Sequence, residues 1–124
     1  MHLYRNATRK TLAMMNFIEC ELLRVFIGEK EKLHHRPIYE LLVSEALERG
    51  MAGATVFRGL LSFGLRHKVH TAKILELAGD LPMVVEIIDS TEKIEEFLPV
   101  LETLLREAGV EALVTRENVR HWTT

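Results

Sequence analysis

The chain has 124 residues, 48% of them hydrophobic, and a net charge of −2 at pH 7. This fits one globular domain and excludes a general nucleic-acid binder, which carries a basic excess. A single cysteine, Cys20, excludes an internal disulfide and a cysteine-based zinc site. No apolar run approaches the roughly 20 residues that span a bilayer, so we expect a cytoplasmic protein without membrane insertion.

The first 18 residues are predicted to be a disordered N-terminal extension, followed by a single domain at 19–124. The extension is basic, and its only apolar cluster, residues 12–15, is shorter than the core of a signal peptide. It also holds three methionines that compete as the natural start of translation: Met1, Met14 and Met15.

In the first half of the chain, alternating apolar residues predict strands at 21–27 and 54–61. Residues 29–35 form a charged loop between the first strand and a helix. That helix is predicted over 37–49, because Pro37 suits a first helical position and Gly50 suits a helix stop.

In the second half, a third strand is predicted at 81–89. A second helix follows, capped by residues 89–91, kinked at Pro99 and ended by Gly109. The remaining segments are expected in this order: a long connection at 62–80 with partial helix around 71–77, a fourth strand at 110–115, and a short extended piece at 119–122.

The element order β-α-β-β-α-β predicts an α+β fold, the ferredoxin-like sandwich. It is a four-stranded antiparallel sheet with two helices on one face. The first and third strands are apolar on both faces, as doubly buried strands are. The face without helices therefore needs another cover, and a second subunit is the simplest one.

A segment without any acidic residue, 49–75, contains the candidate binding residues. Its first half is a strand, and its second half is basic. A glycine there lets backbone N–H groups approach a ligand, and cations bind phosphate or carboxylate. The candidate anion-binding residues are Arg58, Gly64, Arg66, Lys68 and Lys73. The alternative interpretation is a solvated loop whose charges only maintain solubility.

Two further alternatives concern individual side chains. Arg58 and Glu86 lie on predicted neighbouring strands, so they either form a cross-strand ion pair or Arg58 binds an anion in a cleft. His67 and His70, with His34 and His35, are alternative metal ligands, although the spacing lacks a nearby cysteine or carboxylate. No nucleophile motif and no paired carboxylates are present, so we expect no enzyme activity.

Several motifs together resemble the DUF190 family. They are GMAGATVFRG at 50–59, FG at 63–64, DLPMVVEIID at 80–89, LRVFIGE at 23–29 and RPIYE at 36–40. The resemblance covers roughly residues 21–122. That family is similar to the PII signalling proteins, which are ferredoxin-like homotrimers.

The resemblance implies a homotrimer with ligand sites in the clefts between subunits. It also places residues 62–80 on the loop with which PII proteins contact a protein partner, and Gly64 to Arg66 at the base of that loop. PII proteins carry a glycine-rich phosphate-binding turn between the second helix and the fourth strand. Here residues 106–113 hold one glycine and two acids, which disfavours phosphate at that turn.

The expected function is therefore that of a cytoplasmic PII-like regulatory protein. It would bind a small anionic ligand, with a nucleotide as one candidate, and contact an unidentified protein partner through the 62–80 loop. The alternative is a trimeric metal-binding or metal-tolerance protein that uses the loop histidines His67 and His70.

Overall fold

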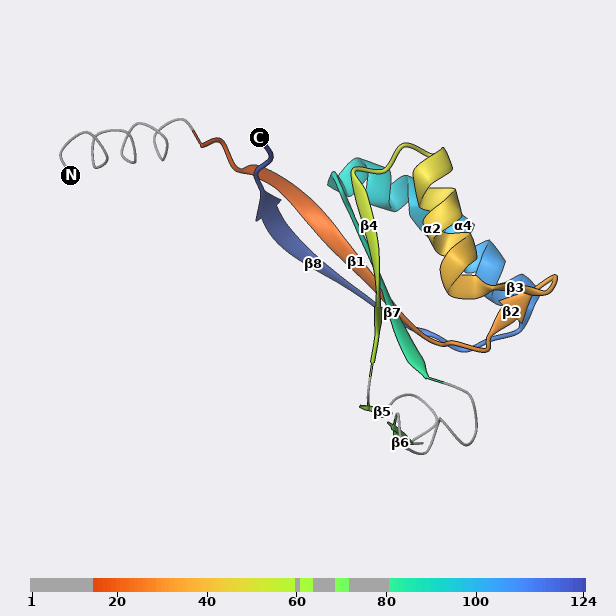
Figure 1. The fold of residues 1–124 in the computed structure, drawn as a ribbon. Helices are drawn as coiled ribbons and strands as arrows, with labels where there is room; N and C mark the ends of the chain where they lie inside the picture. Colours follow the sequence, from red (N-terminus) through yellow and green to blue (C-terminus); the bar gives the residue numbers. More distant parts are fainter. Residues whose placement is uncertain (1–14, 60, 64–68, 72–80) are drawn as a thin grey trace.

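A four-stranded antiparallel sheet forms the centre of the molecule, in the strand order β4-β7-β1-β8 (Figure 1). The computed structural model describes residues 15–59, 61–63, 69–71 and 81–124. The sheet strands are β1 (Ile18–Gly28), β4 (Gly53–Arg58), β7 (Pro82–Asp89) and β8 (Leu113–His121). Apolar and β-branched residues dominate β1 and β7, which suits central strands. The ferredoxin-like α+β prediction is confirmed.

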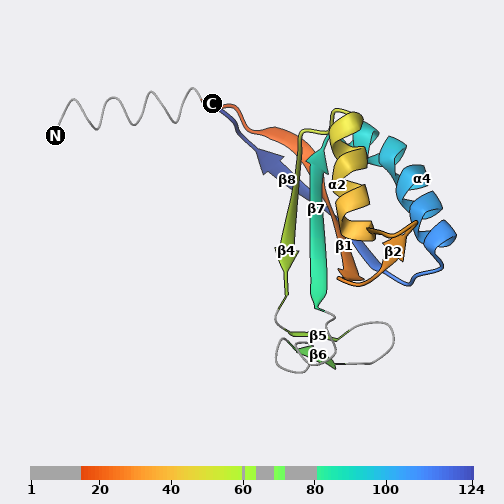
Figure 2. The ribbon, with the colours of Figure 1, turned by 45° about the vertical axis from the view of Figure 1, so that its right-hand side comes forward.

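The two helices lie on one face of this sheet (Figure 2). Helix α2 (Ile38–Glu48) follows Pro37 and packs on β4 and β7, whereas α4 (Thr91–Ala108) packs on β1 and β7. The Ser90 hydroxyl accepts a hydrogen bond from the Lys93 backbone N–H, and Gly109 ends α4 with a left-handed φ of 65°. Both caps were predicted from the sequence, and α4 continues through Pro99.

The core lies between the helices and the sheet. It consists of side chains that alternate along β1 and β7 and those on the inner faces of the helices. The largest fully buried side chains are Phe97, Leu23, Ile38, Leu42, Ile87, Ile94, Val25 and Val85.

The opposite surface, here called the helix-free face, is set by strand register and alternation. It comprises Leu22, Arg24, Phe26, Thr55, Phe57, Val84, Glu86, Ile88, Leu113, Thr115 and Glu117. Nothing in the described part of the chain covers it with a helix, so its apolar side chains stay partly exposed.

No helix of the described residues is long and apolar enough to cross a membrane.

Several local expectations were wrong. The C-terminal region forms one strand, Leu113–His121, and not two short pieces, because β8 pairs with β1 along its whole length. Thr71 lies in a strand, and residues 72–77 of the expected partial helix lie outside the described residues. The expected strand at 54–61 ends at Arg58.

Two small hairpins were not predicted. One pairs β5 (Leu61–Phe63) with β6 (Val69–Thr71). The other pairs β2 (Lys32–Leu33) with β3 (Arg36–Pro37) around a two-residue turn. In that turn His34 and His35 both have positive φ, 51° and 68°, as a type I′ turn requires.

An ion-pair network links the helix-bearing face of the sheet to α4. Arg116 of β8 donates to both carboxylate oxygens of Glu21 at 2.8 and 2.9 Å, and to Glu95 of α4 at 2.8 Å. The hydrogen bonds from Arg116 hold the pKa of the buried Glu21 carboxyl below its ordinary value. Strands β1 and β8 are therefore joined by a charged contact as well as by their backbone hydrogen bonds.

We expect the parent protein to lose more stability in acid than a Glu21→Gln variant does. In the unfolded chain the glutamate pKa is about 4.3, and in the folded chain it is lower. The stabilisation is thus present above the unfolded value and is lost as pH falls through the folded value. Urea unfolding midpoints between about pH 7 and pH 3 measure this difference. Parallel declines in the two proteins would contradict it.

Candidate functional site

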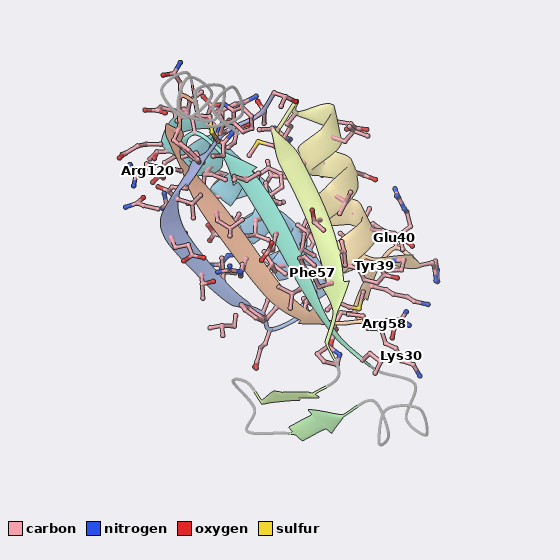
Figure 3. All side chains as sticks on the ribbon, turned by 60° about the vertical axis from the view of Figure 1, so that its left-hand side comes forward. Lys30, Tyr39, Glu40, Phe57, Arg58 and Arg120 are labelled. Carbon is pink, nitrogen blue, oxygen red and sulfur yellow. The ribbon has the colours of Figure 1, made fainter. Side chains whose placement is uncertain are left out.

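The candidate site lies at one end of the sheet, where β4 ends and β7 begins (Figure 3). There Gly28 pairs with Pro82, and Arg58 pairs with Met83. The same end carries the start of β8, because Phe26 pairs with Leu113. The connection from α4 to β8 therefore enters the sheet at the same end at which β4 ends and β7 begins.

Arg58, the last residue of β4, is the predicted site residue whose side chain the structure describes. Its side chain is 56% exposed, and its Nη2 donates to Oε1 of Glu29 at 2.6 Å. Glu29 directly follows β1 and is 23% exposed. The contact places one carboxylate and one guanidinium at the point where the chain leaves the sheet.

The predicted alternative, an ion pair between Arg58 and Glu86, is wrong. The register pairs Glu86 with Thr55, and Arg58 with Met83. Because side chains alternate along a strand, Arg58 lies on the helix-bearing side and Glu86 on the helix-free face. Glu86 instead accepts a hydrogen bond from Arg24 at 2.7 Å.

Backbone hydrogen bonds fix the strand ends around this pair. The Glu29 N–H donates to the Leu81 carbonyl at 2.7 Å, and the Gly59 N–H donates to the Pro82 carbonyl at 2.7 Å. A Cβ atom at Gly59 would meet Pro82 Cγ at 3.0 Å, so glycine allows the close approach of the two chains. The positions of Arg58 and Glu29 thus follow from the sheet itself.

The first turn of α2 lies at the same end of the molecule. The Ile38 N–H donates to the Glu31 carbonyl at 2.9 Å, which ties the helix start to the segment after β1. Figure 3 shows Lys30 and Arg58 projecting at this end, with Tyr39 and Glu40 on the helix above them. The local charge is mixed, so a ligand here would meet both cations and carboxylates.

The other predicted anion ligands cannot be placed. Gly64, Arg66, Lys68 and Lys73 lie outside the described residues. The structure brings Glu29 to Arg58, a partner that sequence reasoning missed. Alternation along β1 places Ile27 on the helix-bearing side, and Glu29, two residues later, lies on the same side. This pattern is visible in the sequence and could have indicated Glu29 as a partner of Arg58.

The described residues offer no set of ligands for the predicted alternative metal site. No group of three or more histidine, cysteine or acidic side chains suited to a metal occurs among the residues that the structure describes. His34 and His35 form the exposed β2–β3 turn. His67 lies outside the described residues, and for His70 only the strand backbone is described.

Cys20 is buried near the start of β1, and burial, followed by the charge of Asp89, raises the pKa of its thiol. A buried thiol with a raised pKa is a poor nucleophile. Cys20 is therefore a small packing residue of β1.

A second candidate surface is the helix-free face, which has a charged centre. Arg24 donates to Glu86 at 2.7 Å and to Glu117 on the other neighbouring strand. Hydrogen bonds to Glu86 and then Glu117 raise the pKa of Arg24. Apolar side chains lie along the strands on either side, among them Leu22, Phe26, Val84, Ile88, Phe57 and Leu113. The sequence predicted the uncovered face but not this cluster.

The sheet order and the one-sided helices define the class of ferredoxin-like α+β proteins. One solved structure of this class is CPII from Thiomonas intermedia K12, a nitrogen regulatory PII-like protein bound to ADP, AMP and bicarbonate. It superposes with a TM-score of 0.65 at 11% sequence identity, covering 86% of this chain and 91% of that chain. At this identity the similarity shows the fold alone.

The chain belongs to the DUF190 family, described as "Uncharacterized ACR, COG1993", whose sequence profile matches residues 20–121. The resemblance found in the sequence is therefore confirmed.

Relatives include two UPF0166 proteins of Aquifex aeolicus (strain VF5). One is 43% identical over 84 residues, covering 68% of this chain and 80% of the relative. The other is 31% identical over 101 residues, covering 82% and 95%. A UPF0166 protein of Methanocaldococcus jannaschii is 28% identical over 93 residues, covering 75% and 85%.

Proposed function

We propose that this protein is a PII-like regulatory protein, not an enzyme, that binds a small anionic ligand at the end of the sheet where Arg58 lies. The observation that carries the proposal is the exposed Arg58 guanidinium at the end of β4, where the acid-free segment leaves the sheet. Arg58 would grip a phosphate or carboxylate through its planar set of donors. In the proposal Gly64, Arg66, Lys68 and Lys73 complete the site.

The ligand class follows from the chemistry of the site and from the structural neighbour. CPII is bound to ADP, AMP and bicarbonate, all of them anions. In this chain the last turn of α4 carries Glu107, and the connection from α4 to β8 carries Glu111 and a single glycine, Gly109. Acidic side chains there oppose a phosphate, so the proposal places the anion at Arg58 and not at that connection.

The proposed assembly is a cytoplasmic homotrimer in which copies of the chain cover the helix-free face. Apolar residues of that face are exposed in the single chain: Phe57 by 51% and Leu113 by 44%. Large exposed apolar groups on one face indicate a protein contact. The ligand would lie between neighbouring subunits, and the 62–80 loop would contact a protein partner.

Binding of ADP, AMP and bicarbonate, each titrated separately by calorimetry, tests the proposal. A ligand at 100 times its dissociation constant should add about 2.7 kcal/mol to the stability of the folded protein. An Arg58→Gln variant should bind about tenfold or more weakly, because charged hydrogen bonds to the anion are lost.

Arg49→Gln provides a matched control for that experiment. Arg49 follows α2 at the other end of the helix and pairs with Glu45 four residues earlier at 3.2 Å. The variant changes the net charge equally but leaves the strand end intact, so it should bind like the parent. Equal affinities of the parent and Arg58→Gln would overturn the proposed site.

A further inference from the structure

Glu29 contacts the described chain on both sides of the segment between β4 and β7. Its carboxylate accepts a hydrogen bond from Arg58 at 2.6 Å, directly before that segment. Its backbone N–H donates to the Leu81 carbonyl at 2.7 Å, just before β7 begins. The backbone hydrogen bond to Leu81 fixes the main chain of Glu29. Its carboxylate therefore stays within hydrogen-bond distance of the Arg58 guanidinium.

The pair has consequences for any anion that approaches Arg58. An ion pair of one guanidinium and one carboxylate has no net charge, so it attracts a distant anion only weakly. At short range the incoming anion meets the Glu29 carboxylate as a like charge. The ligand and Glu29 therefore compete for the same N–H donors of Arg58.

We propose that Glu29 is an internal counter-ion that competes with the anionic ligand for Arg58 and thereby sets the affinity of the site. This inference rests on the proposed function, since it assumes that Arg58 binds the ligand. In the ligand-free protein, Glu29 holds the guanidinium. A bound phosphate or carboxylate replaces Glu29 as the partner of Arg58, and the carboxylate of Glu29 returns to solvent.

The test compares four proteins: the parent, Glu29→Gln, Arg58→Gln, and the double variant. Each is titrated with ADP, AMP and bicarbonate by calorimetry. Glu29→Gln should bind about two- to fivefold more tightly than the parent, the range expected when a partly exposed ion pair is removed. In the Arg58→Gln background the same substitution should change the affinity by less than about twofold. The gain should also shrink as sodium chloride is raised, because salt screens the competing pair.

Glu31→Gln serves as the control for net charge, because it removes one negative charge two residues further along. Its affinity should stay within about twofold of the parent. If Arg58→Gln weakens binding but Glu29→Gln leaves it unchanged or weaker, the competition is overturned while the proposed function stands. If the parent binds none of the three anions, or Arg58→Gln binds as the parent does, both proposals are overturned.

Discussion

Substitution of Arg24 by methionine is expected to dissociate the proposed trimer. Arg24 lies between Glu86 and Glu117 at the centre of the helix-free face. In the variant both carboxylates remain without their cation, and covering them with another subunit would desolvate two uncompensated charges. The concentration at which half the protein is assembled should rise on the order of a hundredfold or more.

Light scattering coupled to size exclusion measures this result directly. The parent should have three times the chain mass of 14.3 kDa, and the variant should approach the mass of one chain. In a single chain the cluster is partly exposed, with Arg24 at 33%, so the fold itself should change little. Secondary structure measured by circular dichroism should therefore stay as in the parent.

Replacing the whole cluster gives the sharper control. A triple variant, Arg24→Met, Glu86→Leu and Glu117→Leu, removes the charges together and leaves no uncompensated carboxylate. Replacement of a buried ion cluster by apolar residues is often neutral or stabilising, so the triple variant should assemble again. If Arg24→Met keeps the mass and the unfolding midpoint of the parent, the helix-free face is not the subunit interface.

Phe97→Ala should lower the free energy of unfolding by about 3–5 kcal/mol, the usual range for a buried phenylalanine. Phe97 of α4 is 1% exposed and packs in the core between the helices and the sheet. A domain of this size has about 5–15 kcal/mol of stability in all. The variant should therefore unfold at a much lower urea concentration, measured by circular dichroism.

Phe57→Ala is the matched comparison. Phe57 has the same side chain but lies on the helix-free face with 51% exposed. Its loss should weaken assembly in light scattering and change the unfolding of the single chain by less than about 1 kcal/mol. An equal loss of stability in the two variants, measured at a concentration where both are single chains, would contradict the division between core and interface.

The elements that local sequence specifies were predicted well. The predicted strands at 21–27 and 81–89 match β1 and β7 within a few residues. Ser90 and Gly109 marked the ends of α4, because capping depends on a few neighbouring groups. Element order then gave the ferredoxin-like fold.

Features that depend on distant pairing were not predicted. Residues 115–118 read Thr-Arg-Glu-Asn, a polar sequence that is not typical of a strand. They are nevertheless part of β8, because β1 supplies the backbone groups with which they pair. The His34–His35 turn was missed because Asn-Gly and related pairs are the usual signal for such turns. The position of Arg58 on the strand of the acid-free segment could be predicted, but its partner depends on which face each side chain occupies. That is why Glu29 took the place assigned to Glu86.

The place of β1 between β7 and β8 has a consequence for how the chain folds during synthesis. Its contact with β8 joins Glu21 to Arg116, 95 residues later. One side of this apolar strand therefore has no partner until β8 leaves the ribosome. Folds dominated by such distant contacts form slowly, and open strand edges invite pairing with other chains. We expect β8 to act as the closing strand, so that C-terminal truncation before it should yield aggregated protein.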